Sequence, residues 1–348
     1  NLNLLFRKLK RLLVFNLYYD KELDFKIIAS IDKINQQIES LSRSSLTDKF
    51  FKAWRVEGPF DSNYSLAILN RHFAQALDTK ISSTRIYNTE GYGDYNTDYQ
   101  FLEKYPKFLE LLRRSKNNSD NTQIISRNLY PPRVIDMNGN INILHSYGWE
   151  ESEFPKDWVD DFNSCLQGLT VMSNQVKSIL INNGVKVPIR IAGLGLDHIS
   201  DIQPSTKYKI SAKKYKFLHV SSCFPRKGID ILLKAYSMSF TSDDQVSLVI
   251  KTFDNPHNNI INILNSIKQN NPLFPDVIII NDDLSDNELK CLYLQSDVLV
   301  APSRGEGFGL PIAEAMLLDI PVITTNWGGQ KDFCNDGNSW LIDYRFES

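Results

Sequence analysis

A glycine-rich stretch flanked by two glutamates is the part of this chain best suited to chemistry. Residues 303–311 read SRGEGFGLP, and Glu314 follows eight residues after Glu306. Glycines let backbone N–H groups approach a ligand, and a helix starting near Pro311 adds unpaired donors and a positive dipole end. Carboxylates accept hydrogen bonds from hydroxyl groups. The stretch therefore predicts a site for an anionic ligand with sugar or ribose hydroxyls; the alternative is a strand–helix turn with two surface glutamates.

Two cations form a second candidate site. Arg226 and Lys227 lie in residues 221–230, SSCFPRKGID, directly after a predicted strand over 217–221. Doubly wound sheets bind ligands at the carboxyl ends of their strands. Arginine grips phosphate oxygens in pairs and lysine acts as a point charge, so both could stabilise a departing diphosphate. The alternative is a solvated Arg-Lys pair.

The elements that must position these residues alternate regularly. Short apolar runs predict strands and runs at helical spacing predict helices, which together indicate a parallel sheet with helices on both faces. The predicted strands are 217–221, 246–251, 277–280, 298–300, 322–325 and 338–342, and the predicted helices are 229–236, 260–268, 286–294 and 312–318.

Residues from about 51 onward show the same α/β texture. The predicted strands are 51–56, 141–144, 168–171 and 187–191, and the predicted helices are 65–77, 155–165 and 174–182. Ser62, Asn63 or Ser65 is the expected cap of the helix over 65–77. Residues 90–121 are polar and tyrosine-rich and receive no assignment. Rising polarity at 202–206 indicates a linker, so we expect α/β domains over 51–202 and 203–348.

Residues 1–50 are expected to form an N-terminal helical extension or linker. Within it, residues 4–14 are basic and amphipathic. They predict either a helix in peripheral contact with a membrane surface or a packing and connecting helix.

Bulk composition narrows the function classes. A length of 348 residues suits two domains, and a net charge of −2 argues against a nucleic-acid partner. No apolar run is long enough to span a bilayer. The four cysteines are scattered without metal-ligand spacing, which favours reduced thiols in a cytoplasmic protein, with or without contact at the inner face of the membrane. No metal site is predicted.

The motif from Glu306 to Glu314, followed by PVITTNWGG at 321–329, resembles the donor-site signature of GT-B-fold retaining glycosyltransferases of family 4. The resemblance covers roughly residues 55–345. It implies two Rossmann-like, doubly wound parallel-sheet domains facing across a cleft. It also implies metal-independent transfer of a hexose from a nucleotide diphosphate sugar to a glycan or glycolipid acceptor, with no further cofactor, in surface polysaccharide biosynthesis.

The resemblance also assigns roles to single residues. Glu306 would hold donor-sugar hydroxyls, and His145 would lie at a strand's end near the reacting carbon. The remaining donor-binding residues would be Arg226 and Lys227 on the pyrophosphate, the N–H groups of Phe308, Gly309 and Leu310 on sugar and phosphate, Glu314 on the ribose and Asn281 at the base. A hydrogen-bonded structural histidine is the alternative for His145.

The acceptor side rests on fewer residues. Ser62 belongs to the loop 58–65, which matches a family loop but lacks its paired glycines, and Glu150 could bind or deprotonate an acceptor hydroxyl. Two further departures concern the donor domain. Val220 and Ser221 stand where many relatives carry Gly-Arg, so Arg226 would replace that arginine, and the chain stops soon after the strand over 338–342 without the family's returning helices.

Two other functions compete with sugar transfer. One is a catalytically silent nucleotide-sugar-binding or scaffolding domain of a larger protein. The other is an epimerase or phosphorylase on the same fold, although a phosphorylase needs a pyridoxal-phosphate lysine site that the sequence does not show.

Overall fold

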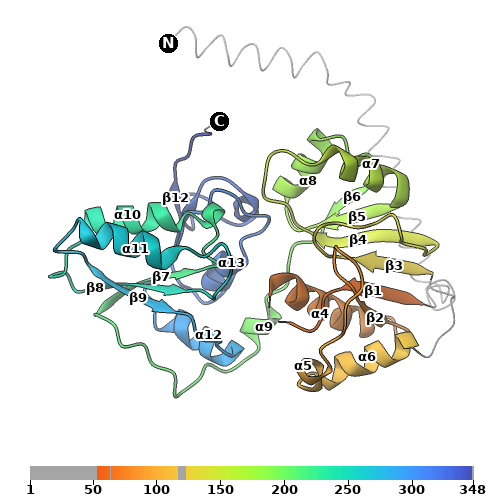
Figure 1. Cartoon of the computed structure of the whole chain (residues 1–348), viewed down its shortest axis with the longest axis horizontal. Helices are drawn as coiled ribbons and strands as arrows, with labels where there is room; N and C mark the ends of the chain where they lie inside the picture. Colours follow the sequence, from red (N-terminus) through yellow and green to blue (C-terminus); the bar gives the residue numbers. More distant parts are fainter. Residues whose placement is uncertain (1–52, 63, 117–122, 347–348) are drawn as a thin grey trace, which may run out of the picture.

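Two six-stranded parallel sheets form the centre of the molecule, each flanked by helices on both faces (Figure 1). The structure is a computed structural model that describes residues 53–62, 64–116 and 123–346. Residues 1–50, and with them the predicted membrane contact at 4–14, lie outside the described residues. The predicted fold class, two doubly wound parallel sheets, is confirmed.

The N-terminal sheet has the strand order β2-β1-β3-β4-β5-β6. Its strands are β1 (Trp54–Gly58), β2 (Arg85–Asn88), β3 (Ile124–Arg127), β4 (Ile141–Tyr147), β5 (Gly168–Val171) and β6 (Ile189–Ile191). Its helices are α4 (Ser65–Asp78), α5 (Tyr99–Glu103), α6 (Pro106–Lys116), α7 (Lys156–Cys165) and α8 (Asn174–Asn182), and α9 (Asp197–Ser200) leads toward the second sheet. One core packs α4 and α6 on β1 and β2, and another packs α7 and α8 on the central strands.

The C-terminal sheet has the order β12-β11-β10-β7-β8-β9. Its strands are β7 (Tyr215–Val220), β8 (Val246–Lys251), β9 (Asp276–Ile280), β10 (Val298–Ala301), β11 (Val322–Thr325) and β12 (Trp340–Ile342). Its helices are α10 (Ile229–Ser239), α11 (Ile260–Gln269), α12 (Asp286–Leu294) and α13 (Leu310–Leu317), with short 3-10 turns η1 (Pro225–Lys227) and η2 (Gly329–Asp332). Two apolar cores cover the two faces of this sheet.

Most predicted elements coincide with observed ones, and the misses lie in the N-terminal sheet. The short strands β2 and β3 and the helices α5, α6 and α9 were not predicted. The cap prediction for α4 is wrong for Ser62 and Ser65, because Tyr64 occupies the cap position and makes no side-chain cap hydrogen bond. The predicted boundary between residues 202 and 203 lies in a stretch between α9 and β7 that has neither helix nor strand.

Each sheet has one point where the chain reverses its direction of travel across the strands. In the N-terminal sheet this switch point lies between β1 and β3, and in the C-terminal sheet between β7 and β10. Loops at the carboxyl ends of strands flanking a switch point are the usual ligand-binding positions of doubly wound sheets.

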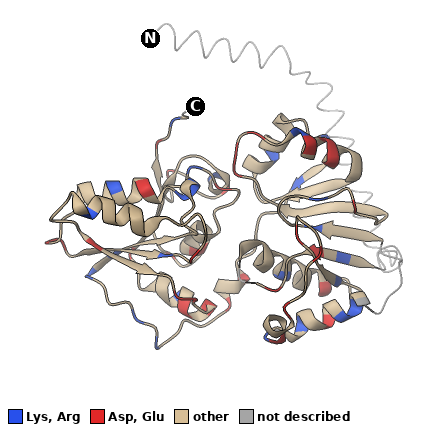
Figure 2. Ribbon diagram, in the orientation of Figure 1, with Lys and Arg blue, Asp and Glu red and all other residues tan. Residues whose placement is uncertain are grey.

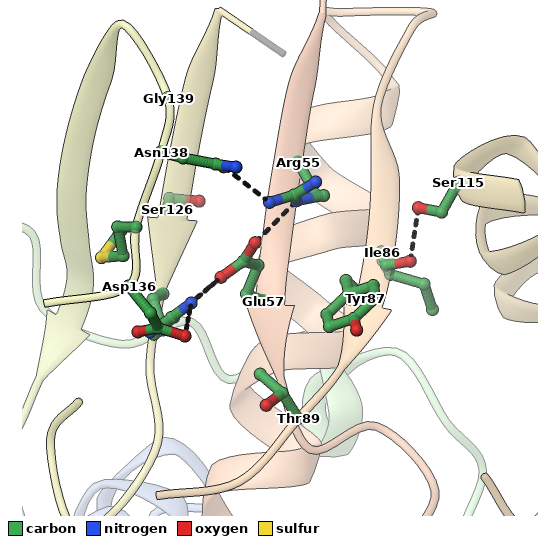
Figure 3. Close-up of polar contacts among 12 residues, drawn as sticks. Arg55, Glu57, Ile86, Tyr87, Thr89, Ser115, Ser126, Asp136, Asn138 and Gly139 are labelled. Atoms are coloured by element: carbon green, nitrogen blue, oxygen red, sulfur yellow. Dashed lines mark hydrogen bonds and ion pairs between the residues drawn. The ribbon is translucent and has the colours of Figure 1, made fainter. Parts of the chain in front are cut away.

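A buried ion network fills the sheet at the N-terminal switch point (Figure 3). Glu57 of β1 accepts hydrogen bonds from Arg55 Nε at 2.6 Å and from Arg127 Nε of β3 at 2.7 Å. Arg127 NH1 also donates to Asp136 Oδ1 at 2.6 Å. Since Glu57 and Arg127 are almost fully buried, each compensates the desolvated charge of the other.

Charges of both signs are spread over both domains (Figure 2). Among the described residues, no helix combines the length and the apolar character needed to cross a membrane.

Candidate functional site

The loops after β7 and β10 meet at the C-terminal switch point. Lys227 Nζ lies 2.7 Å from Glu306 Oε1 and 2.8 Å from Glu306 Oε2. Ser303 Oγ donates to Glu306 Oε1 at 2.7 Å, and the Arg304 N–H donates to the Arg226 carbonyl at 2.7 Å. The structure thus brings together the two segments that the sequence marks as candidate sites.

The second cation connects this switch point to the N-terminal domain. Arg226 NH2 lies 3.1 Å from Glu150 Oε1 in the loop after β4, and Arg226 NH1 lies 3.8 Å from Glu306 Oε2. Arg226 NH1 also donates to the Gly305 carbonyl at 3.1 Å. We call Glu150, Arg226, Lys227 and Glu306 the charge cluster. Its two cations and two carboxylates balance, so an arriving anion must compete with Glu150 and Glu306 for the cations.

The two carboxyl groups of the charge cluster differ in acidity. Burial alone would raise the pKa of Glu306, but the charges of Lys227 and Arg226, with hydrogen bonds from Lys227 and Ser303, hold that pKa below its ordinary value. Burial raises the pKa of Glu150, with Arg226 opposing and Glu306 reinforcing the shift. Glu306 is therefore a firm carboxylate, and Glu150 is the stronger proton acceptor of the two.

The glycines of the turn after β10 have a different role from the predicted one. A β-carbon on Gly305 would lie 2.7 Å from the Glu150 carbonyl oxygen, and one on Gly307 would lie 3.3 Å from the Trp149 nitrogen. Ser173 Oγ, just before α8, donates to the Gly307 carbonyl at 2.7 Å. Gly305 and Gly307 thus leave space for the backbone of the other domain, where the glycine-rich pattern predicted the close approach of a ligand.

The start of α13 keeps the donors that were predicted. Gly309 precedes the helix with a φ of 91°, a conformation that favours glycine. Within the described part of the chain, the N–H groups of Phe308, Gly309 and Leu310 have no hydrogen-bond partner. Unpaired N–H groups at the start of a helix are the kind of donors that bind anions.

Glu314 is engaged by two residues that sequence reasoning missed. Its Oε1 lies 2.7 Å from His198 Nε2 of α9, and its Oε2 accepts a hydrogen bond from the Tyr293 hydroxyl at 2.7 Å. Burial lowers the pKa of His198, but the hydrogen bond and charge of Glu314 outweigh this effect and raise it above its usual value. A ribose hydroxyl would have to share a carboxylate that already accepts two hydrogen bonds.

His145 lies inside β4. This strand was predicted to end at Leu144, but it continues to Tyr147. Its Nε2 lies 2.9 Å from Asn70 Oδ1 and its ring stacks on Phe73 at 4.1 Å. Burial lowers the pKa of His145 to about 3, so the ring is neutral. Its Nδ1 has no hydrogen-bond partner in the described part of the chain, so contact of His145 with a donor sugar stays a prediction.

Asn281 and Ser62 make polar contacts with residues outside the charge cluster. Asn281 follows the edge strand β9 and donates from Nδ2 to Asp254 Oδ1 at 2.8 Å. Ser62 lies in the loop after β1, where its carbonyl accepts a hydrogen bond from Arg71 NH1 at 2.6 Å. Its buried hydroxyl has no partner among the residues that the structure describes.

The C-terminal domain is similar to a known protein family. The family described as "Glycosyl transferases group 1" matches residues 203–345. The capsular polysaccharide biosynthesis glycosyltransferase CapM of Staphylococcus aureus is 26% identical over 196 residues, which cover 51% of this chain and 48% of CapM. The O-antigen biosynthesis glycosyltransferase WclY of Escherichia coli is 35% identical over 101 residues, which cover 29% of this chain and 26% of WclY. The matches thus span about half or less of these curated relatives.

Solved structures resemble the whole fold. Sucrose-phosphate synthase from Thermosynechococcus elongatus has a TM-score of 0.62 at 17% identity, with 84% of this chain and 86% of that chain covered. Alr3699/HepE of Anabaena, solved in complex with UDP, has a TM-score of 0.59 at 14% identity, with 84% and 85% covered. At these identities the likeness concerns the fold alone, and it confirms the predicted GT-B arrangement.

Proposed function

We propose that this chain, whose residues 203–345 match the family described as "Glycosyl transferases group 1", transfers a hexose from a nucleotide diphosphate sugar to a glycan or glycolipid acceptor. The observation that carries the proposal is the contact between Lys227 and Glu306 at the C-terminal switch point, close in sequence to N–H groups at the start of α13 that have no partner among the described residues. Cations, amide donors and a carboxylate thus meet where a doubly wound sheet binds ligands.

In this proposal the diphosphate replaces the carboxylates around Arg226 and Lys227. The N–H groups of Phe308, Gly309 and Leu310 bind phosphate and sugar oxygens, and Glu306, once released from Lys227, accepts hydrogen bonds from sugar hydroxyls. Arg226 takes the place of the arginine that relatives carry upstream. With two cations neutralising the leaving group, the proposed reaction needs no metal ion.

The proposed reaction retains the configuration of the anomeric carbon. The bond from that carbon to the β-phosphate oxygen breaks, and the acceptor oxygen bonds to the carbon on the same face. The proton of the acceptor hydroxyl passes to the departing phosphate oxygen. Glu150, whose pKa is raised by burial, orients the acceptor hydroxyl or takes this proton instead.

The acceptor class is supported by relatives. The names of CapM and WclY place these relatives in capsular polysaccharide and O-antigen biosynthesis, which supports a surface glycan as the acceptor here. A similar fold was solved with UDP, so a uracil nucleotide is the first candidate for the donor.

Nucleotide binding is tested by thermal shift with UDP, GDP, ADP and CMP. A nucleotide at about 100 times its dissociation constant adds about 2.7 kcal/mol of stability. We expect one nucleotide to stabilise the protein, Lys227→Ala to abolish the effect, and Lys234→Ala, which changes an exposed lysine on α10, to preserve it. No stabilisation by any of the four nucleotides would refute the proposed donor site.

Catalysis is tested separately with Glu306→Gln. We expect this variant to bind the nucleotide but to lose turnover of the matching sugar nucleotide by about 100-fold or more. Unchanged turnover would remove Glu306 from the mechanism. If the unchanged protein binds nucleotide and turns over no matching sugar nucleotide, the silent binding domain becomes the better explanation.

A further inference from the structure

A cavity of about 180 Å³ opens at the edge of the N-terminal sheet, where β2 ends. It lies away from the charge cluster. Ser115 of α6 closes one side and donates from its hydroxyl to the Ile86 carbonyl at 2.7 Å (Figure 3). Its polar and aromatic lining consists mainly of Tyr87, Asn88, Asp94, Tyr95, Thr97 and Tyr99. Sites for drug-sized ligands occupy about 300–1,000 Å³, so this cavity suits a smaller ligand, such as one sugar ring.

Asn88 gives the cavity an unsatisfied polar group. It is 6% exposed, and its Nδ2 donates to Thr97 Oγ1 at 3.2 Å. Its Oδ1 has no hydrogen-bond partner in the described part of the chain. Turning the amide over would leave Nδ2 unpaired instead. Oδ1 is shielded from solvent, and a hydroxyl, which both donates and accepts, is the kind of ligand group that can pair with this amide in either orientation.

The other polar groups of the cavity favour a neutral ligand. The Tyr87 hydroxyl donates to Asp94 Oδ2 at 2.6 Å, and the Tyr95 hydroxyl donates to Asp61 Oδ1 at 2.6 Å. The hydrogen bond from Tyr87 holds the pKa of Asp94 below its ordinary value, so Asp94 is a carboxylate. Phenol oxygens that already donate still accept. The rim therefore attracts hydroxyl donors and repels phosphate and uronate groups, while tyrosine rings supply apolar faces for a sugar.

The position of the cavity relates it to the acceptor side of the proposed site. Three inter-strand steps of about 4.8 Å separate β2 from β4, whose following loop carries Glu150, so the cavity lies about 14 Å away along the sheet. Asp61, the partner of Tyr95, belongs to the same loop as Ser62. We infer that the cavity binds a neutral sugar residue of the acceptor glycan, several residues from the hydroxyl that reacts. This inference rests on the proposed function for the identity of the ligand as an acceptor.

Sugar binding at the cavity is tested by saturation-transfer NMR with the methyl glycosides of glucose, galactose, mannose and N-acetylglucosamine. We expect at least one glycoside to bind, and Tyr99→Ala to raise its dissociation constant about two- to tenfold through loss of ring packing. Tyr92→Ala is the matched control, because Tyr92 is 93% exposed, lies nearby in sequence and does not line the cavity. If circular dichroism shows that Tyr99→Ala does not fold, Asp94→Ala, at an exposed rim position, replaces it.

The outcomes separate this inference from the proposed function. If none of the four glycosides binds, or if the wild type and the folded cavity variant bind equally, the inferred sugar binding at the cavity is refuted. A thermal shift with a nucleotide would still support the proposed donor site in that case. Glycoside binding that only the cavity variant weakens supports the cavity, even where the nucleotides fail to bind and the proposed function is lost.

Discussion

The two switch points of this molecule have the same topology, but their charged residues lie in different places. In the N-terminal sheet, Glu57 and Arg127 occupy the strands themselves and are almost fully buried. In the C-terminal sheet, Lys227 and Glu306 lie in the loops beyond the strands, next to unpaired amides. A parallel sheet can thus hold a buried ion pair at its switch point or place charged residues in the loops beyond it, and only the second arrangement leaves them at a position where ligands bind.

Disrupting the buried pair of Glu57 and Arg127 should have the largest effect on the free energy of unfolding. Arg127→Met leaves Glu57 buried with Arg55 as its remaining partner, and removing one member of a buried pair costs about 3–5 kcal/mol. We expect urea unfolding to show a loss of this size. Arg190→Met, an exposed arginine in β6, is the control and should change stability by about 0.5 kcal/mol or less. If Arg127→Met lowered the free energy of unfolding by less than about 1 kcal/mol, the pair of Glu57 and Arg127 would not stabilise the sheet as proposed.

Changing the proposed donor site should show the reverse pattern, with a small effect on stability and a large one on activity. Arg226 and Glu150 are each 35% exposed, so Arg226→Gln should cost only about 1 kcal/mol of stability or less. Because a positioned cation stabilises the leaving diphosphate, turnover should fall about 100- to 1,000-fold. Steady-state kinetics with the matching sugar nucleotide and Arg190→Gln as control provide the measurement. A variant that is strongly destabilised but fully active would reverse the comparison.

A third polar group, His198 with Glu314, should give the smallest effect and one that depends on pH. The pKa of His198 is raised in the folded state, so its contribution to stability is complete below the ordinary value of about 6.5 and is lost as pH rises through the folded-state pKa. His198→Gln should therefore flatten the decline in melting temperature above that pH. His257→Gln, an exposed histidine, should leave the decline unchanged. Parallel curves for His198→Gln and wild type would show that the pair does not contribute.

The contrast between the switch points also explains what the sequence could predict. Lys227 and Glu306 are 79 residues apart, but each lies in a local motif of glycines, cations and a helix start, and both follow predicted strands. Strand order then brings the two loops together. The fold was predictable for the same reason, because alternating apolar runs require no knowledge of distant contacts.

The remaining features depend on pairings that no local pattern records. Glu57 meets Arg127 across 70 residues, and Glu314 meets His198 across 116, with ordinary residues around each partner. The strands β2 and β3 were missed because each has four residues and a charged end, which weakens the apolar pattern. For His145, the sequence could not show that the strand extends past it and buries the ring.

Gly305 has a consequence for how the two halves of the molecule fit together. Its α-carbon faces the Glu150 carbonyl so closely that a single methyl group there would be only 2.7 Å from that oxygen. Alanine would force the rims of the sheets apart and lengthen the reach that Arg226 needs to touch Glu150. The absence of a side chain at Gly305 thus sets how closely the two domains can approach each other at this point.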